Sequence, residues 1–219
     1  MLRKEALWLS EIISKLEPEH LFPMLNLGSS NQYFREQEQP WIDQLLFRPA
    51  VNQGHKIIHT DLKSDAGVDL VGDLNDPHFV DLLKEQQVKS VLCSNLLEHV
   101  NNRNELCQII NSLIPSGGYL LVTVPRDFPL HLDPIDTLFR PDISELKALF
   151  LDLILVESTI VVDGKLCQAT KTPAFLYVLV MILRLLCPIY QPLRWLNSLR
   201  YSLWLFRNVS ATCIVCKKP

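Results

Sequence analysis

The sequence of 219 residues lacks the features that mark several common classes of protein. No secretory leader follows Met1, because the first residues form a mixed-charge amphipathic stretch and not an apolar core region. The apolar run over 174–186 is shorter than the ~20 residues that a membrane-spanning helix requires. No internal repeat or low-complexity tract is present. These absences argue against a secreted, membrane-spanning or repeat protein and predict a cytoplasmic location.

Paired cysteine motifs are also missing. The six cysteines are scattered in apolar surroundings, where small buried side chains are expected. The single CxxC, formed by Cys213 and Cys216, has no second pair and lies in an apolar, strand-like run. The sequence therefore predicts no metal site and no zinc or redox chemistry at this motif.

Acidic residues are absent from the last quarter of the chain. Residues 164–219 carry eight basic residues and no acidic one, whereas residues 1–163 carry a net charge of −11. The basic residues are spaced among leucine and tryptophan and form no polar, lysine-rich stripe. Nucleic acid is therefore not a predicted partner.

The same part of the chain contains a basic, apolar helical insertion at 170–207, before the last predicted strand. Within it, Trp195, Leu199 and Phe206 share one helical face, and Arg194 lies on the other. Aromatic and aliphatic residues opposite arginine are typical of a helix lying in a membrane interface. We therefore expect 174–207 to contact an anionic membrane surface. The open alternative is burial against protein, as a homodimer interface or a cover over the sheet.

Apolar strand-like runs alternate with helical segments along the chain. Strands are predicted at 22–27, 56–61, 68–71, 88–94, 119–124, 153–162 and 210–216. Helices are predicted at 2–16, within 31–54, from 79, at 101–113 and at 142–150. This alternation predicts a single α/β domain over 1–219, Rossmann-like and doubly wound. Its seven-stranded sheet should be mainly parallel, with helices on both faces and an antiparallel last strand.

Two segments carry a resemblance to a known family. In the first segment, 90–100, a predicted strand runs directly into Leu97-Glu98-His99. In the second, 113–125, a helix ends, the chain turns at Ser116-Gly117-Gly118, and a buried strand follows. Together they resemble the second half of a class I S-adenosylmethionine-dependent methyltransferase, of the small-molecule "methyltransferase type 11-like" kind. The resemblance covers about residues 22–162. It implies S-adenosyl-L-methionine as cofactor and methyl transfer as the reaction.

The resemblance also implies a cofactor site. The turn after the first strand usually contains an acid and three glycines, and this chain keeps only Gly28. Asn26 stands where the acid is common, and Ser30 where a second glycine is common. Asp61 ends the second strand, where the family places the acid that accepts the ribose hydroxyls. Each of these could also be an ordinary element of a strand-to-helix turn.

The remaining cofactor contacts come from two later loops. Asp73 is placed to face the adenine amino group, and the backbone N–H of Leu74 to face a ring nitrogen. Asn95, directly after its strand, is placed beside the methionine end of the cofactor. Glu98 and His99 match a leucine-glutamate-histidine signature of small-molecule members, but they could simply open a helix.

The loop after 119–124 resembles that of methyltransferases linked to glycan assembly, through His131, Pro134, Asp136, Phe139 and Arg140. His131 titrates near neutrality and is the candidate base for a sugar hydroxyl. Asp133 or Asp136 could orient it or hold hydroxyls, and Arg140 could clamp a carboxylate or phosphate. The alternative is that His131 and Arg140 only tie the loop down.

Two functional hypotheses follow. The first is an S-adenosylmethionine-dependent methyltransferase acting on a sugar, glycan or lipid-linked intermediate, peripheral at the cytosolic membrane face. The second is a non-catalytic scaffold or partner protein with the same fold. The turn at 26–30 lacks the acid and two of the glycines of the resembled family, which favours the scaffold, whereas Asp61 and Asp73 favour the enzyme. A nicotinamide oxidoreductase ranks third, since it would require more glycine at 28–33.

Overall fold

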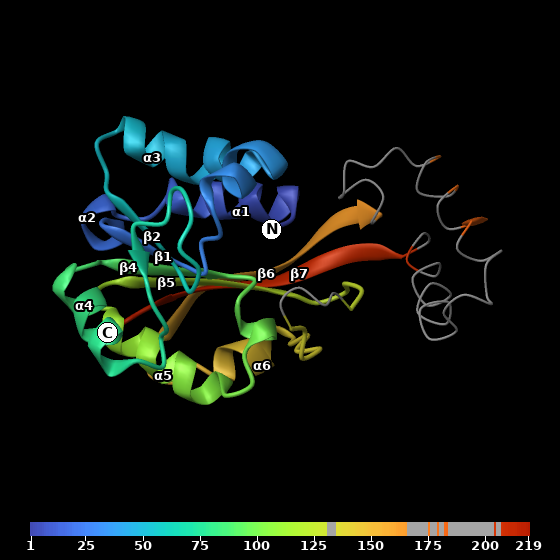
Figure 1. Cartoon of the computed structure of the whole chain (residues 1–219). Coiled ribbons are helices and arrows are strands. Elements are labelled where there is room, and N and C mark those ends of the chain that lie inside the picture. The colour runs from blue at the N-terminus through green and yellow to red at the C-terminus, as the bar shows by residue number, and fades with distance from the viewer. Residues whose placement is uncertain (131–134, 166–174, 176–178, 180–181, 184–203, 205–206) are drawn as a thin grey trace.

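A seven-stranded sheet lies between two layers of helices in the computed structural model (Figure 1). The structure describes residues 1–130, 135–165, 175, 179, 182–183, 204 and 207–219. In chain order the elements are α1 (Arg3–Ile13), α2 (Pro18–Leu21), β1 (Met24–Leu27), η1 (Phe34–Glu38), η2 (Asp43–Phe47), α3 (Arg48–Asn52), β2 (Ile57–Asp61), β3 (Leu70–Val71), α4 (Pro77–Glu85), β4 (Ser90–Ser94), η3 (Leu97–His99), α5 (Arg103–Leu113), β5 (Tyr119–Pro125), α6 (Ile143–Ala148), β6 (Ile154–Lys165) and β7 (Asn208–Lys217).

The strand order is β3-β2-β1-β4-β5-β7-β6. The pairs β3-β2, β2-β1, β1-β4 and β4-β5 are parallel, and β7 runs antiparallel to both β5 and β6. This order confirms the predicted doubly wound sheet with an antiparallel last strand. The chain reverses its winding direction between β1 and β4, and ligands of such sheets bind at the carboxyl ends of the strands near that point.

Two apolar cores cover the two faces of the sheet. One lies under α4, α5 and α6 and includes Leu25, Val91 and Leu120. The other lies under α1 and η2 and includes Leu92 and Leu121. Figure 1 shows α1, α2 and α3 on one side of the sheet and α4, α5 and α6 on the other. Because β5 is buried at every position, its residues are apolar without alternation except for Thr123, as a central strand requires.

Local signals explain where several helices begin. Asp142 caps α6 by accepting the Glu145 backbone N–H, and the Glu145 side chain accepts the Asp142 backbone N–H in return. At α4 the cap is Asp76, and Pro77 occupies the first helical position, where no backbone donor is needed. The helix predicted at 142–150 is confirmed as α6, and the helix predicted at 101–113 is confirmed as α5, both with slightly shorter bounds.

Two N-terminal segments differ in detail from the prediction. Residues 31–54 were predicted to contain a helix and loop, and they form two π-helical turns, η1 and η2, that lead into α3. The helix predicted at 2–16 is shorter, since α1 covers Arg3–Ile13, and its face turned to the core carries Leu9 and Ile12. The acidic Glu5 lies on this same buried face with no exposed surface.

The predicted insertion at 170–207 falls almost wholly outside the described residues and stays a prediction. Four of its described residues are apolar and exposed at helical spacing, namely Phe175, Leu179, Ile182 and Leu183. In the described part of the chain no helix has the length and apolar character needed to cross a bilayer.

The CxxC motif is divided between the two faces of the sheet. Cys213 packs with Val161 in a small cluster under α1, whereas Cys216 belongs to the core under α5 and α6. Burial raises the pKa of both thiols, to about 11 for Cys216. Residues three apart on a strand point to opposite faces, so these two sulfurs cannot share a metal ion. No cluster suited to a metal occurs in the ranges that the structure describes.

Candidate functional site

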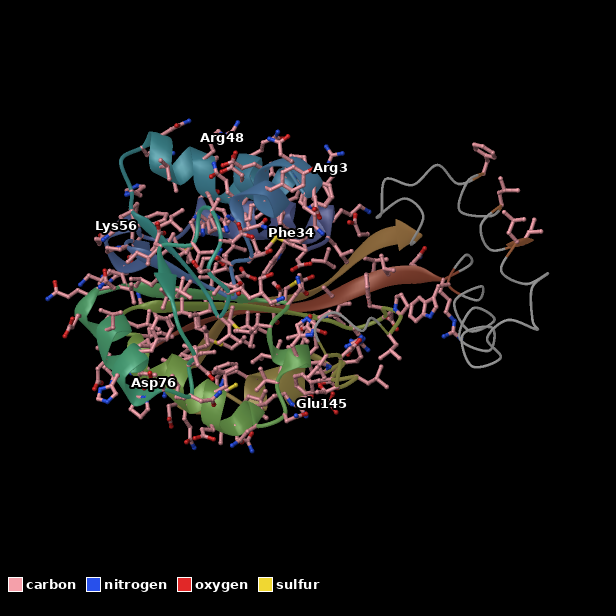
Figure 2. All side chains as sticks on the ribbon, viewed as in Figure 1. Arg3, Phe34, Arg48, Lys56, Asp76 and Glu145 are labelled. Atoms are coloured by element: carbon pink, nitrogen blue, oxygen red, sulfur yellow. The ribbon has the colours of Figure 1, made fainter. Side chains whose placement is uncertain are left out.

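A cavity of about 1270 Å³ opens at the carboxyl ends of β1, β2, β4 and β5. The structure brings all seven predicted cofactor residues to its wall: Asn26, Gly28, Ser30, Asp61, Asp73, Leu74 and Asn95. The α1 side of the wall includes Met1 and Leu2, together with Phe34 of η1, which is labelled in Figure 2. The cavity therefore lies at the reversal point of the sheet, where the fold predicts a ligand site.

The turn after β1 keeps the one glycine that its geometry requires. Gly28 has φ of 63°, and a Cβ there would lie 3.0 Å from Leu96 Cδ1. Both facts favour glycine, since positive φ strains other residues. Ser30 also has positive φ, at 55°, and its backbone N–H donates to Asp61 Oδ2 at 2.8 Å. Asp61 therefore links the end of β2 to this turn.

A buried arginine, which the sequence analysis did not identify, holds the same turn. Arg35 of η1 is 5% exposed and donates to the carbonyl oxygens of Ser29, Ser30 and Gly67 at 3.0, 2.5 and 2.7 Å. Burial lowers the pKa of Arg35, and nearby carboxylates oppose that shift. Because its partners are backbone carbonyls, no sequence motif identifies this contact. The arginine fixes the turn that glycines and an acid form in the resembled family.

Asn26 lies beside a histidine that stays neutral. Its amide Nδ2 lies 3.0 Å from His59 Nδ1, and an amide nitrogen can only donate, so His59 Nδ1 accepts. Burial and the charge of Arg35 lower the pKa of His59 to about 4. The His59 ring is therefore uncharged around neutral pH.

The loop after β3 presents Asp73 to the cavity. Gly72 precedes it, and a Cβ at Gly72 would lie 2.3 Å from the Phe79 ring, so only glycine fits under this ring. Asp73 Oδ1 accepts from the backbone N–H and the side-chain amide of Asn75, at 2.9 and 2.8 Å. These hydrogen bonds fix the orientation of the Asp73 carboxylate in the loop.

The end of β4 is held by a carboxylate from α1. Glu5 Oε1 accepts from Thr123 Oγ1, Asn95 Nδ2 and Ser94 Oγ, at 2.6, 3.0 and 3.2 Å. Its Oε2 accepts the backbone N–H of Leu2 at 2.8 Å. Asn95 has φ of 50°, and its backbone N–H donates to the Thr123 carbonyl at 2.9 Å. Hydrogen bonds of both its backbone and its side chain therefore fix it. The sequence carried one signal for this network, since an acid at position 5 interrupts an apolar helix face.

A second buried carboxylate, Glu98 of η3, also lines the cavity. It has no exposed surface, and neither carboxyl oxygen has a hydrogen-bond partner in the described chain. Burial raises the pKa of the Glu98 carboxyl to about 7. His99 Nε2 lies 3.7 Å from Glu98 Oε1, which is beyond hydrogen-bond distance.

The predicted substrate residues are described only in part. His131 and Asp133 lie outside the described residues. Arg140 and Asp136 form a bidentate ion pair, in which Nη1 and Nη2 of Arg140 donate to Oδ1 and Oδ2 of Asp136 at 3.0 and 2.5 Å. Neither residue lines the cavity. Their predicted roles toward a substrate stay predictions.

The segment that carries these residues is attached to η3 and α5. The backbone N–H and Oγ1 of Thr137 donate to the Glu98 carbonyl at 2.9 and 2.8 Å. His99 Nδ1 donates to the Ile135 carbonyl, and the Arg103 guanidinium lies 4.4 Å from the Phe139 ring centroid. The leucine-glutamate-histidine segment is thus a short 3₁₀ turn that supports the loop beyond β5.

Comparison with known proteins gives structural matches alone. No family model matches the chain, and no curated protein matches its sequence. A SAM-dependent methyltransferase from Archaeoglobus fulgidus superposes with a TM-score of 0.51 at 14% identity, over 97% of this chain and 94% of that one. A SAM-dependent methyltransferase from Anabaena variabilis has a TM-score of 0.56 at 10% identity, over 97% and 83% of the two chains. This chain therefore has the Rossmann-like fold of class I S-adenosylmethionine-dependent methyltransferases.

Proposed function

We propose that the protein is an S-adenosylmethionine-dependent methyltransferase. The observation that carries this proposal is the convergence of Gly28, Asp61, Asp73 and Asn95 on one cavity at the reversal point of the sheet. These residues come from the ends of β1, β2, β3 and β4, as an elongated nucleoside ligand lying across the strand ends requires.

The residues of the cavity fit this cofactor chemically. Each oxygen of Asp61 accepts one backbone N–H, and a carboxylate retains further lone pairs for the two ribose hydroxyls. Asp73 would accept from the adenine amino group, and Asn95 would lie beside the methionine end of the cofactor. S-adenosylmethionine supplies an activated methyl group when bound; the protein orients the acceptor and excludes water.

The proposal predicts that S-adenosylhomocysteine stabilises the protein. At a concentration 100 times the dissociation constant, mass action gives about 2.7 kcal/mol of added stability. Thermal unfolding with increasing ligand measures this, and calorimetry gives the affinity. NAD serves as the control ligand and should not shift the unfolding temperature. If neither S-adenosylmethionine nor S-adenosylhomocysteine binds, the enzymatic proposal is wrong.

One observation favours the non-catalytic alternative. Both oxygens of Asp61 already have protein partners, Ser30 and Lys63, and Arg35 occupies the carbonyls of the turn. Because these hydrogen bonds are made within the protein, the turn and Asp61 keep their positions without a bound cofactor. A scaffold of this fold would bind neither cofactor form, so the same titration separates the two functions.

We further propose a sugar, glycan or lipid-linked acceptor, with His131 as the base. The support is the residue pattern of 131–140 and the attachment of its described part to η3 beside the cavity. The ion pair between Asp136 and Arg140 favours a structural role for these two residues. A His131→Ala variant that retains ligand binding and loses turnover would support the catalytic role, and unchanged turnover would reject it.

Contact with an anionic membrane is proposed for 174–207. Its support is the absence of acids from 164–219 and the exposed apolar residues at helical spacing. We expect the protein to float with anionic liposomes and not with neutral ones, and to be released by high salt. Replacing Phe175, Leu179 and Ile182 by serine should abolish flotation. Leu151→Ser, at another exposed leucine, is the control and should have no effect.

A further inference from the structure

Glu98 differs from the other buried acid at the cavity, Glu5. Glu5 accepts four hydrogen bonds, whereas neither oxygen of Glu98 has a hydrogen-bond partner in the part of the chain that is described, and its one ion-pair contact there is with His99 Nε2 at 3.7 Å. A buried carboxyl group without a hydrogen-bond partner costs stability, so its retention requires a reason such as a catalytic role or a bound water or ion. Glu98 lines the same cavity as the predicted cofactor residues.

Its position along the edge of the sheet indicates which end of a ligand it meets. Asp61 ends β2, the Gly28 turn follows β1, and Asn95 and η3 follow β4. A nucleoside held at β2 and β1 therefore extends toward β4 and β5, where Glu98 lies near Asn95 and Pro125 on the cavity wall. This is the end at which a methyl group would leave the cofactor.

We propose that the Glu98 carboxylate faces the transferable methyl group and takes the proton of the acceptor atom. The inference rests on the proposed methyltransferase function, and within it Glu98 is the alternative to His131 as the group that takes the acceptor proton. The acceptor lone pair forms a bond to the methyl carbon, and the carbon–sulfur bond breaks with its electron pair on sulfur. The proton of the acceptor O–H or N–H passes to a Glu98 oxygen and then to water after product release.

Burial allows Glu98 to change protonation near neutral pH. Its oxygens are covered in this conformation. This role therefore requires the Glu98 side chain to change rotamer and turn its carboxyl into the cavity that the residue lines. Burial is the main reason that the pKa of Glu98 is raised to about 7. Arg140 and the Met1 amino group oppose the shift, Glu5 adds to it, and His99 lies 3.7 Å away. A proton acceptor works best when its pKa lies near the working pH.

Sinefungin tests this geometry without knowledge of the acceptor. It resembles S-adenosylmethionine but carries an amine in place of the transferable methyl group, so its ammonium would meet Glu98. We expect the wild-type protein to bind sinefungin about 10-fold more tightly than S-adenosylhomocysteine at pH 8, as a charge-assisted hydrogen bond gives. Protonation of Glu98 should reduce this preference at pH 6. Glu98→Gln should abolish it at both pH values and leave S-adenosylhomocysteine affinity unchanged.

The outcomes separate this inference from the proposed function. Binding of both ligands with a preference that neither pH nor Glu98→Gln alters would overturn the role of Glu98 and leave the methyltransferase proposal intact. Failure of both ligands to bind wild-type protein would overturn both. Glu85→Gln, at an exposed glutamate of α4, is the matched control and should bind as wild type does. If Glu98→Gln misfolds, the pH dependence of the wild-type preference still decides the matter.

Discussion

Replacing Glu5 by alanine is expected to lower the free energy of unfolding by about 3 kcal/mol, as loss of a buried, hydrogen-bonded carboxylate does. The variant would leave Thr123 Oγ1, Ser94 Oγ and Asn95 Nδ2 without their common acceptor in the interior. It would also open space beneath α1, since Glu5 has no exposed surface. Urea unfolding measures the effect as a lower midpoint at constant slope.

Two variants make this result specific. Glu11→Ala removes an exposed acid from the same helix and should change stability by less than about 0.5 kcal/mol. Glu5→Gln keeps one acceptor oxygen but places an amide N–H against the Leu2 backbone donor, so its loss should be intermediate. Equal stability of the two alanine variants would contradict the network described for the end of β4.

Replacing Asp61 by alanine is expected to weaken S-adenosylhomocysteine binding by about 100-fold, if the proposed function is correct. Two charge-assisted hydrogen bonds to the ribose would be lost, each with a net value of about 1.5 kcal/mol, and the total of about 3 kcal/mol corresponds to a loss of this size. The variant would also release the Ser30 backbone N–H and so loosen the turn around Gly28. Calorimetric titration measures the affinity, and circular dichroism verifies that the variant is folded.

An acidic residue away from the cavity provides the control. Asp81→Ala, on the exposed face of α4, should bind S-adenosylhomocysteine with wild-type affinity. Asp61→Asn should fall between the two, since its amide retains one acceptor oxygen but has lost the charge. A folded Asp61→Ala protein with unchanged affinity would show that the ribose lies elsewhere.

Long apolar runs and turn residues made the sheet predictable. The strand at 119–124 is buried at every position, and the run of apolar residues therefore identified it without alternation. The region 31–54 was less predictable, because its π-helical turns depend on tertiary contacts such as those of Arg35 with Ser29, Ser30 and Gly67. Backbone acceptors leave no signature in the sequence.

The same contrast applies to the site. Residues at strand ends, such as Asp61 and Asn95, could be placed in one cavity because the topology dictates where parallel strands end. The partners of Asp136 and Glu5 could not be predicted, since a loop pairing and a helix-to-strand contact depend on how the layers pack. Glu98 was recognised as part of a signature, but only packing reveals that its carboxyl is buried without a partner.

The placement of β7 between β5 and β6 has a consequence for biosynthesis. β6 pairs with β7 along its length, so β6 cannot join the sheet until residues 208–217 have left the ribosome. Until then the nascent chain exposes the apolar edge of β5, which is open to association with other chains. Translation of the 82 residues between Pro125 and Asn208 thus sets a delay during which a chaperone would have to shield that edge.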